Sequence, residues 1–566
     1  MKRAPMTAWY DPFELLRHAP DVLAATIFGQ RADTRLIEAL AAPQATLIDC
    51  SREEDGRPIE ELWMDFVADS GDGFNSTYAI ASAVGRPSLT VRGPGGVEHA
   101  TRRGRILVFG GDQVYPTASR ERYKEKLVLP WKTALSFTDP PHPKAFAIPG
   151  NHDWYDSLVA FSRLFFSRDW FGGWRTPQTR SYFALKLPHH WWVIGTDVQL
   201  DSDVDAPQVE FFERVAREME PEDRIILCTA EPHWIYSHIY GKYDTSGYRK
   251  SSLHFLEEKV FGTPSQPEGR VAVFLSGDLH HYRRHARPDG RQKITAGGGG
   301  ASLHPTHGPD VSMLEGGYGL AKCFPEQRTS KALCWRNLLF LAINPTFGFL
   351  TAFLYLLTAW AVSADIGRLG FSQIGEAITT TLHEVVNKPD AGFWVIAMLL
   401  LFFLFTDTHS RLYRVFGGLV HGLAHLAAVF FIAWGAAYLF SQHFEPGSFA
   451  FVWRFALAVA AGGWVAGSLI LGIYLLVSLN VFQRHSDEAF ASLRIQDFKQ
   501  FLRLRFAADG SLTIFPIGIL RVPRRWKEAP AGAGGPGLLP DDPRATAPAL
   551  IEDPIPAGST GARASG

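Results

Sequence analysis

Four long apolar segments in the second half of this 566-residue chain restrict what it can fold into. A helix needs about 20 apolar residues to cross the hydrocarbon core of a bilayer. Three segments are long enough, and the second is short unless its flanks extend it. Asn344-Pro345 predicts a kink in the first, which membrane helices tolerate. We expect four transmembrane helices within residues 335–482 rather than one very large soluble core, and the segments are roughly 337–362, 393–408, 415–440 and 451–482.

The basic residues around these segments predict their orientation. Lys and Arg are concentrated before the first segment, between the second and third, and after the fourth. The loop 363–392 has only Arg368 and Lys388, and the loop near 441–450 has neither. Because basic loops stay in the cytoplasm, we expect a multi-pass protein of the cell (inner) membrane with both termini cytoplasmic. Four scattered cysteines suit a reducing compartment, and the first residues predict no secretory signal peptide.

The first 310 residues have a different pattern. Short apolar runs alternate with polar or helical connections, as is typical of strands that are buried on both faces. This pattern predicts an α/β domain with helices on both sides of the strands. The net charge of -1 gives no indication of a nucleic-acid partner. The runs are Leu62–Ala68, Ile106–Phe109, Ala145–Ile148, Trp191–Ile194, Ile225–Cys228 and Val271–Leu275.

The flanking regions carry less information. Residues 1–59 are a mixed segment, with helices expected from Pro12 to Phe28 and from Thr34 to Ala41, and a strand at Ala45–Cys50. After the α/β domain (60–325) and the membrane segments (335–482) comes a small cytoplasmic segment, 483–527. We expect a helix over Asp487–Phe506 and a hairpin turn at Asp509-Gly510. The Pro-, Gly- and Ala-rich tail 528–566 is expected to be disordered.

Potential metal ligands follow several of the apolar runs. In Phe109-Gly-Gly-Asp-Gln-Val-Tyr-Pro116, a buried strand delivers Asp112 to a tight glycine turn. Similar stretches are Ala68–Gly73, Pro149–Asp153 and Ser276–His281. Carboxylate and amide oxygens suit hard divalent cations, and imidazole suits zinc, iron or manganese. A pair of metals needs a shared carboxylate and can hold a phosphoryl group, and Asp112 is the candidate bridge.

Taken in order, these motifs resemble the calcineurin-like metallophosphoesterase superfamily. The resemblance rests on Asp69-Ser-Gly71, Gly111-Asp-Gln-Val-Tyr115, Gly150-Asn-His-Asp153 and Gly277-Asp-Leu-His280. The first two are most similar to purple acid phosphatases, and the membrane segments resemble a membrane-anchored branch. The resemblance covers about residues 60–300. It implies a four-layer α/β/β/α sandwich with a dinuclear site where the strands end.

The resemblance also implies roles for individual residues. Asp69, Asp112 and His280 would hold the first metal, with Tyr115 as a further ligand, and Asp112 and Asn151 would hold the second. His152 would face the substrate as an acid or as a donor to the transition-state charge, with Asp153 orienting it. The two ions would be divalent or trivalent manganese, iron or zinc.

Two positions depart from the family pattern, both on the side of the second metal. Asp278 stands where the family usually has a histidine, and an aspartate can still bind a metal. Ala230 stands at the histidine of a His-x-Pro motif. Glu231 or His233 is the candidate replacement for that ligand.

The sequence therefore predicts an integral membrane phosphoesterase with a cytoplasmic catalytic domain, which hydrolyses a phosphate ester through a metal-bound hydroxide. The substrate would be a phosphorylated small molecule or lipid. The alternative is a catalytically degenerate phosphoesterase fold that acts as a sensor or scaffold at the membrane. A small transporter is disfavoured because the apolar segments contain few ionisable residues. Of these, His421 and His425 in the third segment are expected to make helix-packing hydrogen bonds rather than to bind a metal or haem.

Overall fold

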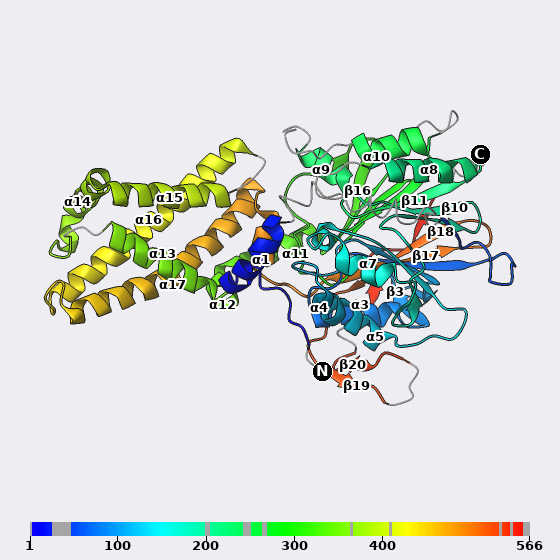
Figure 1. The fold of residues 1–566 in the computed structure, drawn as a ribbon, viewed down its shortest axis with the longest axis horizontal. Helices are drawn as coiled ribbons and strands as arrows, with labels where there is room; N and C mark the ends of the chain where they lie inside the picture. Colours follow the sequence, from blue (N-terminus) through cyan, green and yellow to red (C-terminus); the bar gives the residue numbers. More distant parts are fainter. Residues whose placement is uncertain are drawn as a thin grey trace. The chain divides into compact units, whose positions relative to one another are not determined.

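The computed structural model describes residues 3–24, 47–198, 204–240, 251–262, 269–362, 366–406, 410–530, 535–543 and 547–558. The chain divides into two compact units, each described by itself. The α/β unit contains Met1–Thr7, His18–Ser330 and Arg494–Gly566, and the helical unit contains Ala8–Arg17 and Lys331–Leu493 (Figure 1). The expected helix at Thr34–Ala41 lies outside the described residues.

Two large mixed sheets form the centre of the α/β unit. Sheet 1 has the order β21-β18-β17-β2-β5-β6-β8-β7, with β22 beside β18. Its strands are β2 (Leu62–Val67), β5 (Ile106–Gly110), β6 (Lys144–Ile148), β7 (Trp170–Phe171), β8 (Trp174–Arg175), β17 (Lys499–Phe506), β18 (Leu512–Ile519), β21 (Ala549–Leu550) and β22 (Ile555–Ala557).

Sheet 2 has the order β1-β9-β10-β11-β12-β14-β13-β16-β15. Its strands are β1 (Leu47–Asp49), β9 (Phe183–Leu187), β10 (Trp191–Gly195), β11 (Arg224–Thr229), β12 (Val271–Ser276), β13 (Tyr282–Ala286), β14 (Gln292–Ala296), β15 (Met313–Leu314) and β16 (Tyr318–Phe324). The strands expected from the apolar runs are all present in the two sheets. The prediction of a mixed α/β domain is confirmed at this level.

Successive side chains of the central strands point into two different cores, which explains why whole runs are apolar. In β2, Met64 and Phe66 pack in a core that contains side chains of both sheets. Trp63 and Val67 point to the other face, where they pack in a second core with helices α3 (Phe74–Val84), α5 (Leu129–Ala134) and α7 (Val159–Phe165). Helix α8 (Ala206–Glu218) and the π-helix η4 (Leu256–Val260) pack in a third core with sheet 2. Both faces of the central strands β2, β5, β10 and β12 are buried, so no polar face interrupts their sequences.

The segment after the last membrane helix differs from its expected form. The helix expected over Asp487–Phe506 is present only as α18 (Ser486–Ala491), and Lys499–Phe506 forms β17. Strand β17 pairs with β2 in sheet 1, and the hairpin to β18 turns at the expected Asp509-Gly510. Leu502, Leu504 and Phe506 of β17 pack in the core shared by the two sheets and alternate with Arg503 and Arg505, which is the period of a strand. Described parts of the tail also form strands, namely β20 (Leu538–Pro540), β21 and β22.

The helical unit contains two helices that are long and apolar enough to cross a membrane, α16 (Arg411–Ser441) and α17 (Phe449–Phe482). Two bent pairs meet the same criterion only when each pair is taken as one span. The first is Gln327–Ile343 with α13 (Phe347–Ala361), bent by 67° at the expected Asn344-Pro345 break. The second is Phe371–Asn387 with α15 (Pro389–Phe405), bent by 99°. The described chain therefore has two to four candidate spans.

A histidine pair lies inside the helical unit. His421 and His425 are buried on α16, and their Nε2 atoms are 3.2 Å apart. The Tyr355 hydroxyl lies 2.9 Å from Nδ1 of His425. These contacts connect α13 and α16 by hydrogen bonds, as expected for polar groups inside membrane helices.

Candidate metal centre

The candidate ligands follow parallel strands whose carboxyl ends lie at one edge of each sheet. Strands β2, β5 and β6 are mutually parallel in sheet 1, and β11 and β12 are parallel in sheet 2. The loops after β2 and β5 continue side by side beyond the strands. Asp69 N donates to Gly111 O at 3.0 Å, and Ser70 N donates to Asp112 O at 3.0 Å. The two key aspartates are thereby held next to each other.

Three of the candidate aspartates have left-handed backbone conformations. The φ angles are 58° at Asp69, 49° at Asp112 and 66° at Asp278. Such angles are uncommon outside glycine, although aspartate adopts them more readily than most residues. Conformations of this kind gather at functional sites, where the surrounding structure holds them in place.

Glycines make room for these carboxylates. A Cβ atom on Gly150 would clash with Oδ1 of Asp112. A Cβ atom on Gly277 or on Gly297 would lie 2.5 Å from Oδ2 of Asp69. Glycines 277 and 297 thus allow the backbone to approach Asp69 closely.

Three candidate ligands contact the buried hydroxyl of Tyr115. The Tyr115 hydroxyl lies 2.7 Å from Asp69 Oδ1, 3.2 Å from Asp112 Oδ2 and 2.9 Å from His280 Nε2. His280 Nε2 is 3.6 Å from Asp69 Oδ1. Ligand atoms that are each about 2.1 Å from one cation lie roughly 3 Å from their neighbours. Two carboxylates, a phenol oxygen and an imidazole are ligand types that suit a hard or borderline cation. The ligand atoms of Asp69, Asp112 and His280 do not all lie within 4.8 Å of one another, so binding of one cation by all three requires side-chain movement.

The hydrogen bond on the far side of His280 favours the metal-binding tautomer. Nδ1 of His280 lies 2.7 Å from the Ser302 carbonyl, which can only accept a proton. A proton on Nδ1 leaves Nε2 with its lone pair, directed at Tyr115 and Asp69. Backbone carbonyls commonly orient metal-binding histidines in this way.

Burial disfavours the negative charges of the aspartates at this site. Burial raises the pKa of Asp69 well above its usual value, and the charges of Asp112 and Asp278 raise this pKa further. Burial also raises the pKa of Asp112, which the charge of His152 partly offsets. The pKa of His280 is well below its usual value, chiefly because of burial. A bound cation would compensate the buried carboxylates.

His152 is oriented by a backbone carbonyl. Its backbone N–H donates to Asp112 Oδ1 at 2.9 Å, and its Nδ1 lies 2.5 Å from the carbonyl of Pro116. Asp153 was expected to orient this ring, but its carboxylate accepts from Gly150 N at 2.9 Å and from the Tyr123 hydroxyl at 2.5 Å. Asp153 is the third residue of helix α6 (Asn151–Trp154). Its carboxylate therefore accepts a hydrogen bond from the backbone at the start of the helix.

On the side where a second metal is expected, the polar groups form hydrogen bonds with tyrosines. Asn151 Nδ2 donates to the Tyr155 hydroxyl at 3.3 Å. The carboxylate of Asp278 accepts from the Tyr236 hydroxyl, and its backbone N–H donates to Asp69 Oδ2 at 2.9 Å. Asn151 and Asp278 contribute oxygen atoms to this side.

The candidates that would replace the missing histidine lie at the start of α9 (His233–Tyr240). Ala230 has no donor, and its methyl group lies beside Gly111. Nε2 of His233 is buried with no hydrogen-bond partner among the described residues, and burial lowers its pKa to about 4. Residues three apart share a helix face, so His233 lies on the face of Tyr236, which contacts Asp278. Glu231 is close enough for its charge to contribute to the raised pKa of Tyr155.

The structure adds residues that the motifs did not indicate. Lys499 at the start of β17 is fully buried and donates to the Ala301 carbonyl at 2.5 Å. Burial lowers its pKa to about 8, and the charges of Asp497, Asp72 and Asp69 counteract this shift. The ring of His304 stacks on His280 at 3.8 Å. Lys499 is far from the motifs in sequence, so no local pattern could have identified it.

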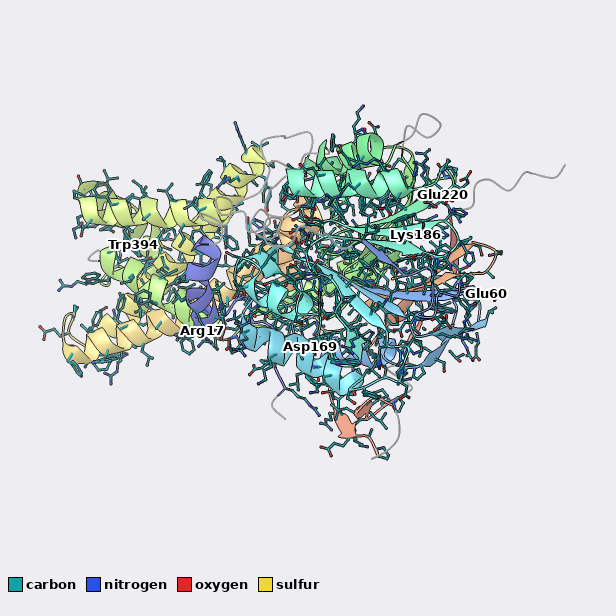
Figure 2. The ribbon with its side chains drawn as sticks, turned by 45° about the vertical axis from the view of Figure 1, so that its right-hand side comes forward. Arg17, Glu60, Asp169, Lys186, Glu220 and Trp394 are labelled. Carbon is teal, nitrogen blue, oxygen red and sulfur yellow. The ribbon has the colours of Figure 1, made fainter. Side chains whose placement is uncertain are left out.

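A second group of potential ligands lies elsewhere in the α/β unit. Atoms of His190, Glu220 and Asp223 lie within 4.8 Å of one another. They border a cavity of about 470 Å³ beside the first residues of β10 and β11; Glu220 and Lys186 on its rim are labelled in Figure 2. Asp223 already accepts from Trp192 Nε1 at 2.7 Å and from Glu220 N at 2.9 Å. We interpret this group as a hydrogen-bonded loop, since its other two members are exposed.

Comparisons with known proteins give only distant similarity. No protein-family model matches the chain. No curated protein sequence matches it. Solved structures similar to part of the chain include the purple acid phosphatase PPD1 from yellow lupin (Lupinus luteus), with 14% identity and a TM-score of 0.30. GAP50, the anchor in the inner membrane complex of Plasmodium, has 14% identity and a TM-score of 0.29, and PhoD has 10% and 0.26.

The similar regions are partial. They cover 43%, 46% and 43% of this chain, and 45%, 76% and 58% of the lupin phosphatase, GAP50 and PhoD respectively. The chain therefore spans less than half of the lupin phosphatase. Similarity at this level leaves the functional argument to the residues of the site.

Proposed function

We propose that this chain is a membrane-attached, metal-dependent phosphoesterase with a four-layer α/β/β/α catalytic unit. The observation that carries the proposal is the convergence of Asp69, Asp112 and His280 on the Tyr115 hydroxyl within 3.2 Å. The donors come from three loops, and the burial of their side chains would be costly without a compensating cation.

A cation held there would supply Lewis-acid polarisation of a phosphoryl oxygen and activation of water. The chain's own residues would do the rest. Asp69 and Asp112 balance the positive charge, and the Ser302 carbonyl holds His280 in the required tautomer. With Nδ1 directed at the Pro116 carbonyl, His152 presents Nε2 to the substrate. A protonated ring there would donate a hydrogen bond to the phosphoryl group or a proton to the leaving oxygen.

A second ion is part of the proposal, with Asp112 as the bridge. Asn151 and Asp278 would supply oxygen ligands, and His233 would replace the histidine that is absent at Ala230. The buried and unpartnered Nε2 of His233, on the helix face of Tyr236, supports this assignment. Asp278, His233 and Asn151 make this a harder and more weakly held site than the first.

The physiological substrate would be a phosphorylated small molecule or a lipid, with the catalytic unit on the cytoplasmic side. This orientation follows from the arginine and lysine distribution around the helices. The alternative function is that of a sensor or scaffold. In that case the site would either bind metal without hydrolysing an ester or bind no metal.

The experiment uses the full-length protein purified in detergent. Loaded with Mn²⁺, it should bind two ions per chain and hydrolyse p-nitrophenyl phosphate or bis(p-nitrophenyl) phosphate. Asp112→Asn should abolish both properties, because the bridge loses its charge. Asp169→Asn, an exposed carboxylate outside the four motifs (labelled in Figure 2), is the control and should retain both. Metal binding without turnover of either ester would favour the scaffold, and absence of metal binding would refute the proposed site.

A further inference from the structure

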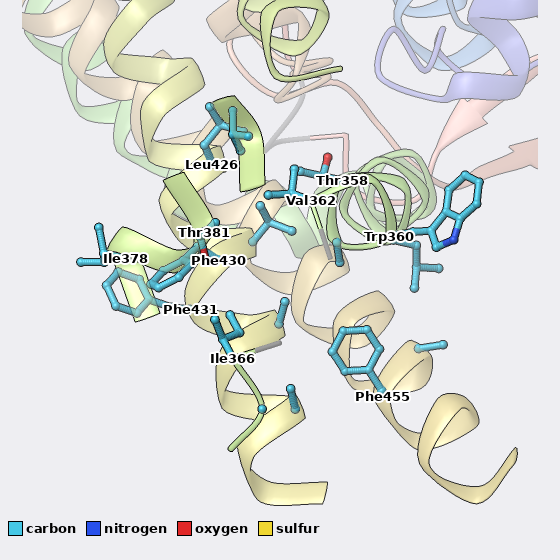
Figure 3. Close-up of a pocket in the computed structure, with 18 of the residues that line it drawn as sticks. Thr358, Trp360, Val362, Ile366, Ile378, Thr381, Leu426, Phe430, Phe431 and Phe455 are labelled. Carbon is cyan, nitrogen blue, oxygen red and sulfur yellow. The ribbon is translucent and has the colours of Figure 1, made fainter. Parts of the chain in front are cut away.

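The helical unit contains a large apolar cavity of about 730 Å³ (Figure 3). Its walls come from α13, α16 and α17 and from α14 (Ile374–Asn387). Figure 3 shows Phe430, Phe431, Ile366 and Ile378 around it. Among the described residues that line the cavity, Arg368 is the only charged one. A cavity with this lining suits a long apolar group with one anionic end.

The loop that carries Arg368 is fixed to α16. Trp434 Nε1 donates to the Leu369 carbonyl at 3.0 Å, and Ser441 Oγ donates to the Gly367 carbonyl at 2.7 Å. Ile366 is buried against Trp434. These contacts hold the backbone on both sides of Arg368, while its own side chain is exposed. The guanidinium is therefore presented at a defined place on the cavity rim.

A second polar group in the cavity wall lacks a partner. The hydroxyl oxygen of Thr381 on α14 is buried with no hydrogen-bond partner among the described residues. Leaving a buried hydroxyl unpaired is unfavourable, and such groups are normally satisfied by protein, water or ligand. An ester carbonyl inside the cavity would accept this hydrogen bond.

Helix α14 lies at a steep angle to the apolar helix α15. The helices Phe371–Asn387 and Pro389–Phe405 are bent by 99°, so α14 runs nearly parallel to the membrane plane when α15 points into the bilayer. Ile378 and Leu382 of α14 line the cavity and keep 40% and 58% of their surface exposed. Glu384 pairs with Lys388 near the C-terminal end of α14. Apolar and charged groups on one such helix are typical of an interfacial position.

We infer that this cavity binds an anionic phospholipid, with one acyl chain between the helices and the phosphate on Arg368. The Thr381 hydroxyl donates to an ester carbonyl of the same lipid. The apolar walls account for the acyl chain, and the single cation accounts for a preference for net negative headgroups. The inference depends on the helical unit lying in a membrane and not on the proposed phosphoesterase activity.

Native mass spectrometry of the full-length protein in detergent tests the inference directly. Phosphatidylglycerol and phosphatidylcholine with identical acyl chains are added separately and their retained stoichiometry is compared. We expect one tightly retained phosphatidylglycerol and a preference over phosphatidylcholine of about fivefold, the effect of one basic residue at an anionic headgroup. Equal retention of the two lipids by the wild-type protein would overturn the inference, whatever the variants do.

Two variants locate the lipid. Arg368→Gln should remove the headgroup preference and leave acyl-chain binding, and Ala427→Phe should fill the exposed mouth of the cavity and reduce both. The matched controls are Arg454→Gln and Ala461→Phe, exposed positions of α17 outside the cavity lining. Both controls should bind like the wild type. If the controls and the cavity variants lose lipid equally, the lipid is bound elsewhere and the inference fails.

Discussion

At the scale of single residues, the candidate site depends most on Tyr115. Its hydroxyl contacts three other candidate ligands, and its side chain is 1% exposed. Tyr115→Phe keeps the ring and removes only the oxygen. We expect metal affinity to fall by at least about tenfold, the size of effect seen when groups around a metal ligand are lost. Metal content after dialysis, measured by mass spectrometry, checks this.

Tyr123→Phe is the matched control for that change. The Tyr123 hydroxyl is also buried and donates to an aspartate, Asp153, at 2.5 Å. Its loss should lower stability by about 1–3 kcal/mol because the carboxylate loses a donor, with metal content unchanged. Equal metal loss in the two variants would mean that Tyr115 acts through folding rather than through coordination.

The pH dependence of stability has a contribution from His285. This buried ring lies 2.7 Å from the Val311 carbonyl through Nε2, and burial lowers its pKa from 6.5 to about 4. Between these values the unfolded chain binds the proton and the folded chain does not. Stability therefore falls as pH is lowered from 6.5 towards 4, and this loss is absent above pH 6.5.

His285→Gln removes the titrating group and isolates its effect. The variant should be less stable than the wild type at pH 7, where packing and hydrogen bonding are altered. At pH 5 the difference should shrink by about 2 kcal/mol, since the wild type alone has the protonation penalty. Thermal unfolding of the full-length protein at the two pH values measures this. A constant difference would show that His285 titrates normally in the folded state.

At the scale of elements, strand β17 is attached to sheet 1 by a buried ion pair. Arg503 and Asp65 face each other in the register of β17 and β2, with Nε and Oδ1 2.6 Å apart. Both side chains are at most 1% exposed. Arg503→Met leaves the carboxylate buried and should cost about 3–5 kcal/mol. Chemical denaturation of the α/β unit within the full chain measures the loss.

Arg505 provides a control on the same strand. It pairs with Glu61 at 2.6 Å, but 44% of its side chain is exposed. Arg505→Met should therefore cost less than about 1 kcal/mol. If the two variants lose equal stability, the buried pair has no special part in attaching β17.

At the scale of the whole chain, the helical unit is an insertion in the sequence of the α/β unit. Sheet 1 contains β2, β5 and β6 from before the helices and β17, β18, β21 and β22 from after them. A fragment ending at residue 330 would leave β2 as an unpaired edge and expose the apolar residues that β17 covers. We expect this fragment to aggregate, as judged by size-exclusion chromatography and light scattering.

The matched control is a shortened chain that joins residues 1–330 to 494–566 through a flexible Gly/Ser linker and omits the helical unit. It should be soluble without detergent and bind metal, because both halves of sheet 1 are present. A monomeric, cooperatively unfolding 1–330 fragment would show that β17 and β18 are dispensable. If the full-length protein folds but the joined chain aggregates, the helical unit is required for folding of the α/β unit.

The sequence by itself determined the central strands, the long apolar helices and the order of the motifs. Apolar runs bounded by glycine and polar residues predicted the central strands, because strands buried on both faces leave continuous apolar sequence. The length and hydropathy of the later segments predicted long apolar helices, of which two to four are candidate spans, and the break at Asn344-Pro345. The motif order indicated Asp69, Asp112, Tyr115 and His280, since parallel strands bring their carboxyl-end loops to one edge.

Only the tertiary structure decided which distant segments complete these elements. The pairing of β17 with β2 and the burial of Lys499 near Asp69 depend on contacts across more than 400 residues, and no local pattern contains them. The position of Nδ1 of His152 beside the Pro116 carbonyl, and the hydrogen bond from Gly150 N to Asp153, also became visible only in the folded chain. The local pattern of apolar residues predicts which side chains are buried. Only the folded chain shows which distant residues they pack against.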